Sequence, residues 1–282
     1  MNSIYDKKVR IGDNILRFLI YLSAFLSVAV LVSIIGLVFI KGLPALSLNF
    51  LITTPSTITG NFGILGNIVN TLYIIVITLL IATPISVGGA IYLTEYANGG
   101  KLVKAIEFTI ETLSGIPSII FGLFGMVFFG QFFGYCILTG ALTLTLMVLP
   151  IITSSTQVAL KGVPTSYRQG AIGMGATKWY MIRTVILPSA LPGIVTGIIL
   201  GVGRIVGESA ALLFTAGSSY NLARSLFGHI FKSGGTLTVQ MYLCMSKANY
   251  DEAFGIALVL ILFVFLLNRL THIIANHVNR EK

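Results

Sequence analysis

Six apolar stretches constrain the possible fold of this chain more than any other feature of its sequence. Each is near the roughly 20 residues that an α-helix needs to cross the hydrocarbon core of a bilayer, the last two with the help of flanking residues. The stretches cover residues 18–40, 68–93, 112–133, 135–152, 191–214 and 253–267. Only 10% of the residues are charged, against about 25% in average soluble domains. The sequence therefore predicts an all-α integral membrane protein with about six transmembrane helices.

The basic residues are distributed unequally between the two sides of such a bundle. If the N-terminus lies in the cytoplasm, the alternating connections place most of them on the cytoplasmic side: Lys7, Lys8, Arg10, Arg17, Lys101, Lys104, Lys161, Arg168, Lys178, Arg183, Arg269, Arg280 and Lys282. The outer side receives Lys41, Arg224, Lys232 and Lys247. Cytoplasmic loops of membrane proteins carry an excess of Lys and Arg, so we expect both termini in the cytoplasm. The same distribution accounts for the net charge of +9 without a nucleic-acid partner.

The connection between the fourth and fifth stretches, residues 160–186, is polar enough to leave the bilayer on the cytoplasmic side. Ser166 and Gln169 have the spacing of a helix-capping box, which predicts that a short helix begins there and runs to about Gly175. Small residues within this segment leave one side of the helix open to a partner. From the helix alone, an ordinary loop between two spans explains the segment equally well.

The longer pattern of this segment resembles the Glu-Ala-Ala loop of ABC importer permeases. That loop has Glu-Ala-Ala, three residues, Gly and, downstream, Ile-x-Leu-Pro, and in those proteins it forms a coupling helix that docks into a groove on the ATPase subunit. By position, Gln169 and Gly170 replace the Glu and the first Ala, so they depart from the pattern. The resemblance implies that the residues that couple this chain to an ATPase are Gln169, Gly170, Ala171, Gly175, Ala176, Leu187 and Pro188.

Arg204 and Glu208 place two charges inside the fifth apolar stretch. An Arg at the centre of a membrane helix costs roughly 2.5 to 3.5 kcal/mol, so we expect Arg204 to face protein or water rather than lipid. On a continuous helix, one arc of about 80° would hold both charges and several small residues: Gly193, Gly197, Gly201, Arg204, Glu208 and Thr215. Two interpretations stay open. The charges neutralise each other as an i,i+4 ion pair, or Arg204 offers its forked donors to a tetrahedral oxyanion while Glu208 holds the guanidinium.

The sequence around this pair resembles the phosphate-specific ABC permeases of the PstA type. The resemblance rests on Arg204–Ala210, on Leu212–Ala216, and on Gly115–Gly125 in the third stretch. In that family an intramembrane Arg and Glu are implicated in the passage of phosphate, and they match Arg204 and Glu208. The resemblance therefore implies the type I, MetI-like bundle of importer permeases, with a substrate pathway that includes Arg204, Glu208, Ser209 and Thr215.

The same resemblance implies the organisation of the chain and its partners. Residues 1–66 hold the cytoplasmic tail, first helix and outer loop, 67–275 the permease domain with a coupling loop at 160–186, and 276–282 a cytoplasmic tail. The expected partners are a homologous permease in a heterodimer, two ATP-binding subunits and an extracytoplasmic phosphate-binding protein, in the cytoplasmic membrane of a prokaryote. The chain itself is expected to bind no cofactor, because the partner ATPase uses the ATP.

Several functional classes find little support in the sequence. The chain lacks the Gly-x-x-x-x-Gly-Lys-[Ser/Thr] phosphate loop, a Gly-x-Ser-x-Gly elbow and the ligand spacing of a metal site, so we expect neither an enzyme nor a metalloprotein. Glu95, Glu107 and Glu111, near cytoplasmic helix ends, are expected to be solvated or interfacial. The remaining alternatives are an ABC permease for another oxyanion or solute, such as molybdate, sulfate or phosphonate, and a passive channel or structural membrane subunit.

Overall fold

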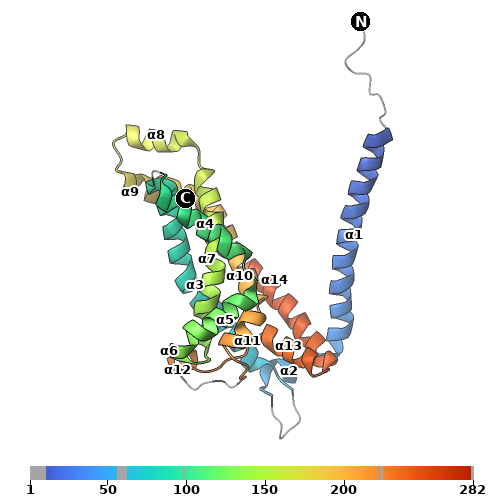
Figure 1. Cartoon of the computed structure of the whole chain (residues 1–282). Coiled ribbons are helices and arrows are strands. Elements are labelled where there is room, and N and C mark those ends of the chain that lie inside the picture. Colours follow the sequence, from blue (N-terminus) through green and yellow to red (C-terminus); the bar gives the residue numbers. More distant parts are fainter. Residues whose placement is uncertain (1–10, 56–61, 98, 221, 223–224, 281–282) are drawn as a thin grey trace.

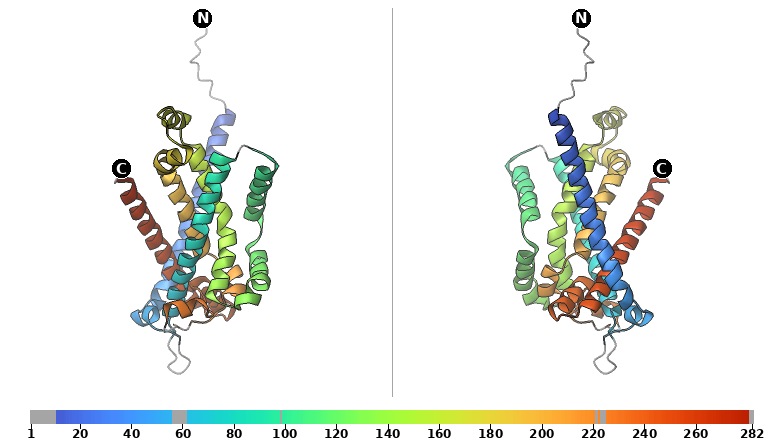
Figure 2. Two further views of the ribbon diagram at one scale, coloured as in Figure 1. Left: turned by 90° about the vertical axis from the view of Figure 1, so that its left-hand side faces the viewer. Right: turned by 90° about the vertical axis from the view of Figure 1, so that its right-hand side faces the viewer.

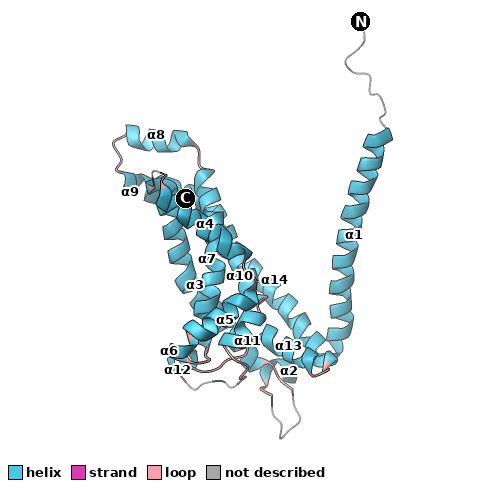
Figure 3. Cartoon of the chain, in the orientation of Figure 1, coloured by secondary structure: helices cyan, strands magenta, loops and turns pink. Residues whose placement is uncertain are grey.

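The computed structural model describes residues 11–55, 62–97, 99–220, 222 and 225–280. Throughout this part of the chain the regular secondary structure is helical, without a strand (Figure 3). The long helices are α1 (Ile11–Gly42), α3 (Leu65–Ile91), α7 (Ile137–Lys161), α10 (Leu187–Val206) and α14 (Tyr250–Arg280). Of the basic residues that predict the orientation, Lys7, Lys8, Arg10, Arg224 and Lys282 lie outside the described residues.

Shorter helical elements connect the long helices. They are η1 (Leu43–Ala45), α2 (Leu48–Ile52), η2 (Tyr92–Tyr96), α4 (Lys101–Gly115), α5 (Ser118–Phe128), α6 (Gly130–Phe133), α8 (Thr165–Gly173), α9 (Lys178–Met181), η3 (Ile182–Ile186), α11 (Ala210–Thr215), α12 (Leu226–Ile230) and α13 (Leu237–Ser246). Two of these elements are π-helical: η2 continues α3, and η3 joins α9 to α10.

The apolar stretches form five continuous helices long enough to cross a membrane, and one broken pair. The continuous spans are Gly12–Ala45, Leu65–Tyr96, Ile137–Lys161, Lys178–Val206 and Tyr250–Thr271. The pair of α4 and α5 provides the sixth crossing when both helices are counted as one span. The predicted all-helical membrane fold is confirmed, and its third crossing is built differently from the others.

The third apolar stretch does not form the continuous helix predicted for residues 112–133. α4 ends at Gly115 and α5 begins at Ser118, with a bend of 107° between them. Ile116 is extended, with φ −74° and ψ 131°. This conformation is expected before Pro117, because a proline ring disfavours the α conformation of the preceding residue. The two halves lie along one side of the bundle (Figure 2).

α7 is the central helix, because α3 and α10 both pack against it over much of their length. The contact with α10 pairs three glycines with residues of α7: Gly193 with Ala159, Gly197 with Ser155, and Gly201 with Val148. A Cβ added to Gly197 would approach the Cβ of Ser155 to 2.7 Å. Small residues let two helices approach closely in a membrane. These glycines, spaced by four residues, therefore form the contact of α10 with α7.

α1 stands apart from the rest of the molecule. It diverges from the bundle along most of its length and meets it only near its C-terminal end (Figure 1). There Gly42 lies against α14, where an added Cβ would come within 2.6 Å of the carbonyl oxygen of Phe254. The side chains of α1 are apolar and largely exposed. The helix therefore presents a long apolar surface to whatever surrounds the bundle.

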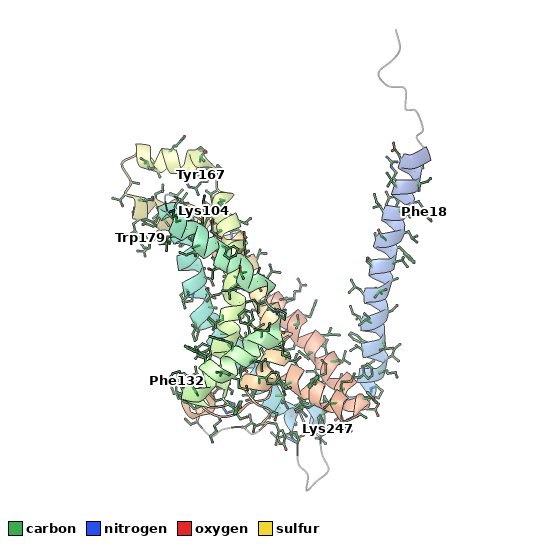
Figure 4. All side chains as sticks on the ribbon, in the orientation of Figure 1. Phe18, Lys104, Phe132, Tyr167, Trp179 and Lys247 are labelled. Carbon is green, nitrogen blue, oxygen red and sulfur yellow. The ribbon has the colours of Figure 1, made fainter. Side chains whose placement is uncertain are left out.

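The two ends of the bundle carry different elements. The N-terminus of α1, the C-terminus of α14 and the α8–α9 connection lie at one end, which we call the α8 end (Figure 1 and Figure 2). α2, α6, α12 and α13 lie at the other, which we call the α13 end. In Figure 4, Tyr167 and Trp179 mark the α8 end, and Phe132 and Lys247 mark the α13 end. Six crossings place the start of α1 and the end of α14 at one end of the bundle, as observed.

Candidate functional site

The fifth apolar stretch is interrupted beside its charged residues. α10 ends at Val206 and α11 begins at Ala210, so the continuous helix predicted for residues 191–214 is wrong. The backbone carbonyl of Glu208, which has no helical partner at this break, accepts a hydrogen bond of 2.8 Å from the Thr238 hydroxyl. Arg204 thus lies in the last turn of α10, whereas Glu208 lies in the break before α11.

The Glu208 carboxylate is buried and fixed by the helix that follows it. Its Oε1 accepts a hydrogen bond of 3.1 Å from the backbone N–H of Ala211, and only 6% of the side chain is exposed. A carboxylate at this position satisfies an N–H group that has no partner within the helix, and it lies at the positive end of the helix dipole. Glu208 thus stabilises the start of α11.

The Arg204 side chain is much more exposed than that of Glu208 and is held by fewer contacts. Its Nη2 lies 3.6 Å from Oε2 of Glu208, and 44% of its side chain is exposed. Within the described part of the chain, we find no hydrogen bond from this guanidinium. The guanidinium has five N–H donors in a planar fork, and such a fork is suited to oxyanions.

The other two residues predicted for the substrate pathway differ in position. Ser209 is half-buried at the break, directly beside Glu208. Thr215 is fully buried at the end of α11, where its hydroxyl donates to the carbonyl of Ala211 at 2.8 Å. Its own carbonyl accepts from the backbone N–H of Cys136 at 3.1 Å. The structure thus brings Arg204, Glu208 and Ser209 together and places Thr215 in the protein interior.

The predicted short helix of the 160–186 connection is α8, but its ends differ from the prediction. It begins after Pro164 with no side-chain cap, so the capping box of Ser166 and Gln169 does not form. The first N–H groups of this exposed helix can bond to water, and a cap is not required. The helix ends at Gly173, and Gly175 follows with φ +80°, a conformation that favours glycine.

The residues predicted to couple the chain to an ATPase divide into two groups. Gln169, Gly170 and Gly175 are exposed at the α8 end. The others are buried or half-buried in or beside an apolar cluster that joins the connection to the spans: Ala171, Ala176, Leu187 and Pro188. Large apolar side chains also face outward here, namely Tyr167, Ile172, Met174, Trp179 and Tyr180. An exposed apolar surface at a polar end of the bundle indicates contact with another protein.

One contact of this connection was missed by the sequence analysis. Glu95, expected to be solvated or interfacial, is 6% exposed and forms an ion pair of 2.7 Å with Arg168 of α8. The carboxylate is covered rather than solvated because the loop folds over the end of α3, and the interfacial alternative for Glu95 is not contradicted. A carboxylate at a span end and an Arg 73 positions later carry no local pattern that connects them.

Comparisons with known proteins agree on one family. Residues 86–282 match the family model described as "binding-protein-dependent transport system inner membrane component". The chain is 36% identical over 259 residues to the probable ABC transporter permease protein YqgI of Bacillus subtilis (strain 168), covering 88% of each chain. It is 31% identical over 262 residues to the phosphate transport system permease protein PstA of Pasteurella multocida (strain Pm70), covering 92% of each. A solved inward-facing structure of the MetNI methionine ABC transporter has a similar fold, with a TM-score of 0.60 at 22% identity over 77% of this chain and 94% of that chain.

Proposed function

The chain belongs to the binding-protein-dependent transport system inner membrane components and is a permease subunit of an ABC importer, and we propose that the solute it carries is inorganic phosphate. As a member of this family it is a non-catalytic, multi-pass subunit of a prokaryotic plasma membrane, and a separate ATPase subunit hydrolyses ATP. The similarity to a PstA protein supports phosphate as the solute.

The open Arg204 beside the fixed Glu208 is the observation that carries the proposal. Glu208 is held by Ala211 whether or not it balances the arginine, so an anion can take over the guanidinium without unfolding α11. A phosphate oxygen pair would match the Arg fork, and charge-assisted bonds of this type are about twice as strong as neutral ones. In this mechanism Arg204 binds the anion as it passes the helix break. The Glu208 carboxylate then pairs with the Arg204 guanidinium again, and the anion is released.

The proposal includes the arrangement of the complex. Residues 1–66 would form the cytoplasmic tail, the first helix and the outer loop. Residues 67–275 would form the permease domain, with the coupling loop at 160–186, and residues 276–282 would form a cytoplasmic tail. The α8 end would face the cytoplasm with both termini, and the α13 end would meet an extracytoplasmic phosphate-binding protein. A homologous permease would complete a heterodimer, for which the exposed apolar face of α1 offers a surface. The complex would hold two ATPase subunits, one of which would dock on the exposed side of α8.

The test is ATP-driven uptake of labelled phosphate into proteoliposomes that hold the whole complex with its binding protein. Arg204→Gln removes the charge and the fork, whereas Arg204→Lys keeps a charge without a fork. We expect uptake to fall about 100-fold in the first variant, as for loss of one charge-assisted contact, and less in the second. Arg269→Gln, at an exposed arginine of α14, is the matched control and should leave uptake unchanged.

Three outcomes would contradict the proposal. Full uptake by Arg204→Gln would show that Arg204 and Glu208 form only a structural ion pair and do not bind the solute. Uptake without ATP would indicate a passive channel. Uptake of labelled molybdate, sulfate or phosphonate in preference to phosphate would keep the permease class and replace the solute.

A further inference from the structure

α8 is held to the membrane spans by very little apolar contact. Of its nine residues, only Ala171 is buried. The helix touches α9 and η3 but leaves most of its surface exposed at the tip of the bundle (Figure 1). Burial of one alanine contributes little to the position of a helix, because hydrophobic stabilisation scales with the apolar area removed from water. Its position must therefore depend on polar contacts.

Arg168 supplies these contacts from the middle of α8. Its Nη2 donates to Oε1 of Glu95 at 2.7 Å and to the carbonyl of Leu160 at 2.8 Å. Its Nη1 donates to the carbonyl of Val163 at 2.7 Å, and its Nε donates to Glu95 at 3.2 Å. One guanidinium thus joins α8, the end of α7 with the connection that follows it, and the π-helical end of α3.

The end of α3 holds the connection at a second point. Tyr96 follows Glu95 in η2, and its ring lies 4.9 Å below the ammonium of Lys178 in α9. Neighbouring residues of one helix end therefore hold both sides of the loop that contains α8. α8 also contacts η3, the other π-helical element. π-helical turns are rare and occur frequently at functional sites.

We propose that Glu95 and Arg168 form a clamp that fixes α8 to α3, so that a movement of α8 on its ATPase is passed to α3 as well as along the chain to α10. Both are positioning residues: neither touches the solute. The inference rests on the proposed function only for the contact between α8 and an ATPase, and it holds for any solute. A charged clamp suits this task because it is short and directional, whereas one alanine contact would let α8 tilt.

The test compares Glu95→Gln with wild type in the reconstituted complex, measuring both solute imported per ATP hydrolysed and the stimulation of ATP hydrolysis by the loaded binding protein. A merely structural role would lower the amount of folded complex but leave both ratios unchanged. We expect both ratios to fall about tenfold in Glu95→Gln, within the usual range of coupling between sites. Glu95→Asp, which keeps the charge, should recover part of the loss, and Glu107→Gln is the matched control.

Arg168→Lys decides the question if Glu95→Gln does not assemble. A lysine keeps the charge, but its single ammonium cannot reach the carboxylate and both carbonyls with the geometry of a fork, so the ratios should again fall. Wild-type ratios in an assembled Glu95→Gln or Arg168→Lys complex would overturn the clamp. Both ratios are measured with labelled phosphate or, if the wild-type complex does not import phosphate, with whichever of molybdate, sulfate or phosphonate it imports. Failure of the wild type to import phosphate would therefore count against the proposed solute and not against the clamp.

Discussion

Two Arg–Glu pairs of this protein have the same chemistry and opposite constructions. Arg168 and Glu95 at the α8 end are 2.7 Å apart, and 20% of the arginine side chain is exposed. Arg204 and Glu208 at the helix break are 3.6 Å apart, and 44% of the arginine side chain is exposed. Both carboxylates are equally covered, at 6% exposure. The difference therefore lies in what surrounds each guanidinium.

The difference teaches how one residue type serves two purposes. The N–H groups of Arg168 are used on a carboxylate and two carbonyls, which leaves little capacity for a ligand. Arg204 uses one nitrogen on a distant carboxylate that a backbone N–H already stabilises. A fully engaged guanidinium acts as a structural tie, and an open one remains available to an anion. Four tests would break or sharpen this comparison.

Removal of the arginine should cost far more stability at the clamp than at the break. Arg168→Ala leaves the Glu95 carboxylate covered and unpaired, a change that costs about 3 kcal/mol for buried pairs. Arg204→Ala leaves Glu208 bonded to Ala211 and removes a half-exposed partner, for which we expect about 1 kcal/mol or less. The melting temperatures of the two purified variant complexes measure the difference. Equal losses would refute the distinction between a closed and an open pair.

The glycine contact of α10 tests how far close packing against α7 stabilises the helix that carries Arg204, measured as the melting temperature of the purified complex. Gly197→Ala would push α10 from Ser155 of α7, and overpacking of this kind costs typically about 2 kcal/mol. Gly203→Ala is the matched control, because nothing lies within 4 Å of the position of its Cβ. Alanine should be neutral or slightly stabilising there, since it is the better helix former. If the control destabilises the protein as much as Gly197→Ala does, the close contact is not the cause.

These features differ in how far the sequence predicts them. The spans and the glycine face follow from hydropathy and helical period, which are local properties that composition and spacing express directly. The breaks at Pro117 and at Gly207–Ser209 do not follow from the apolar runs, because hydropathy predicts which residues lie in the membrane and not their backbone conformation. The proline at position 117 indicates a possible break in the helix. Gly207 gives no comparable indication, because the other glycines of this stretch remain helical.

The candidate site shows the same division. Arg204 and Glu208 were found because charge inside an apolar stretch is conspicuous, but their relation was predicted on a helix that does not continue. The clamp was missed altogether, although Arg168 lies next to the predicted coupling residues. Its partner lies 73 residues away in the chain, and only the fold over the end of α3 brings the two together.

Glu208 offers a smaller test, which separates its cap from its charge. Glu208→Gln keeps an oxygen that can accept from Ala211, so we expect stability to change little. Glu208→Ala removes the acceptor, and loss of a helix cap costs about 1 kcal/mol. Both variants remove the balancing charge, so a change in phosphate uptake shared by both would report on Arg204 alone. Thermal unfolding and uptake of the two variants should be measured side by side. If Glu208→Gln loses as much stability as Glu208→Ala, the charge and not the cap stabilises the break.

The contact between His229 and Asn70 at the α13 end provides a comparison without a formal charge. His229 Nε2 lies 2.7 Å from Asn70 Oδ1, and the amide nitrogen of Asn70 donates to the carbonyls of Ser219 and Gly235. Since Oδ1 is then the acceptor, the imidazole donates through Nε2. Burial, and next the charge of Lys232, lower the pKa of His229 below its ordinary value of 6.5.

A lowered pKa gives the contact a defined pH dependence. The unfolded chain binds a proton at His229 near pH 6.5, whereas the folded chain resists it until lower pH, so the contribution of this residue to stability is complete above that value and is lost as the pH falls below it. His229→Gln can still donate to Asn70 and cannot be protonated. We expect the difference in melting temperature between wild type and His229→Gln to change between about pH 7.5 and about pH 5.5, with the wild type losing more stability as the pH falls. If the melting temperatures of the two proteins change in parallel with pH, the imidazole does not titrate in this range. The contribution of the His229–Asn70 contact to stability would then be independent of pH, as it is expected to be in His229→Gln.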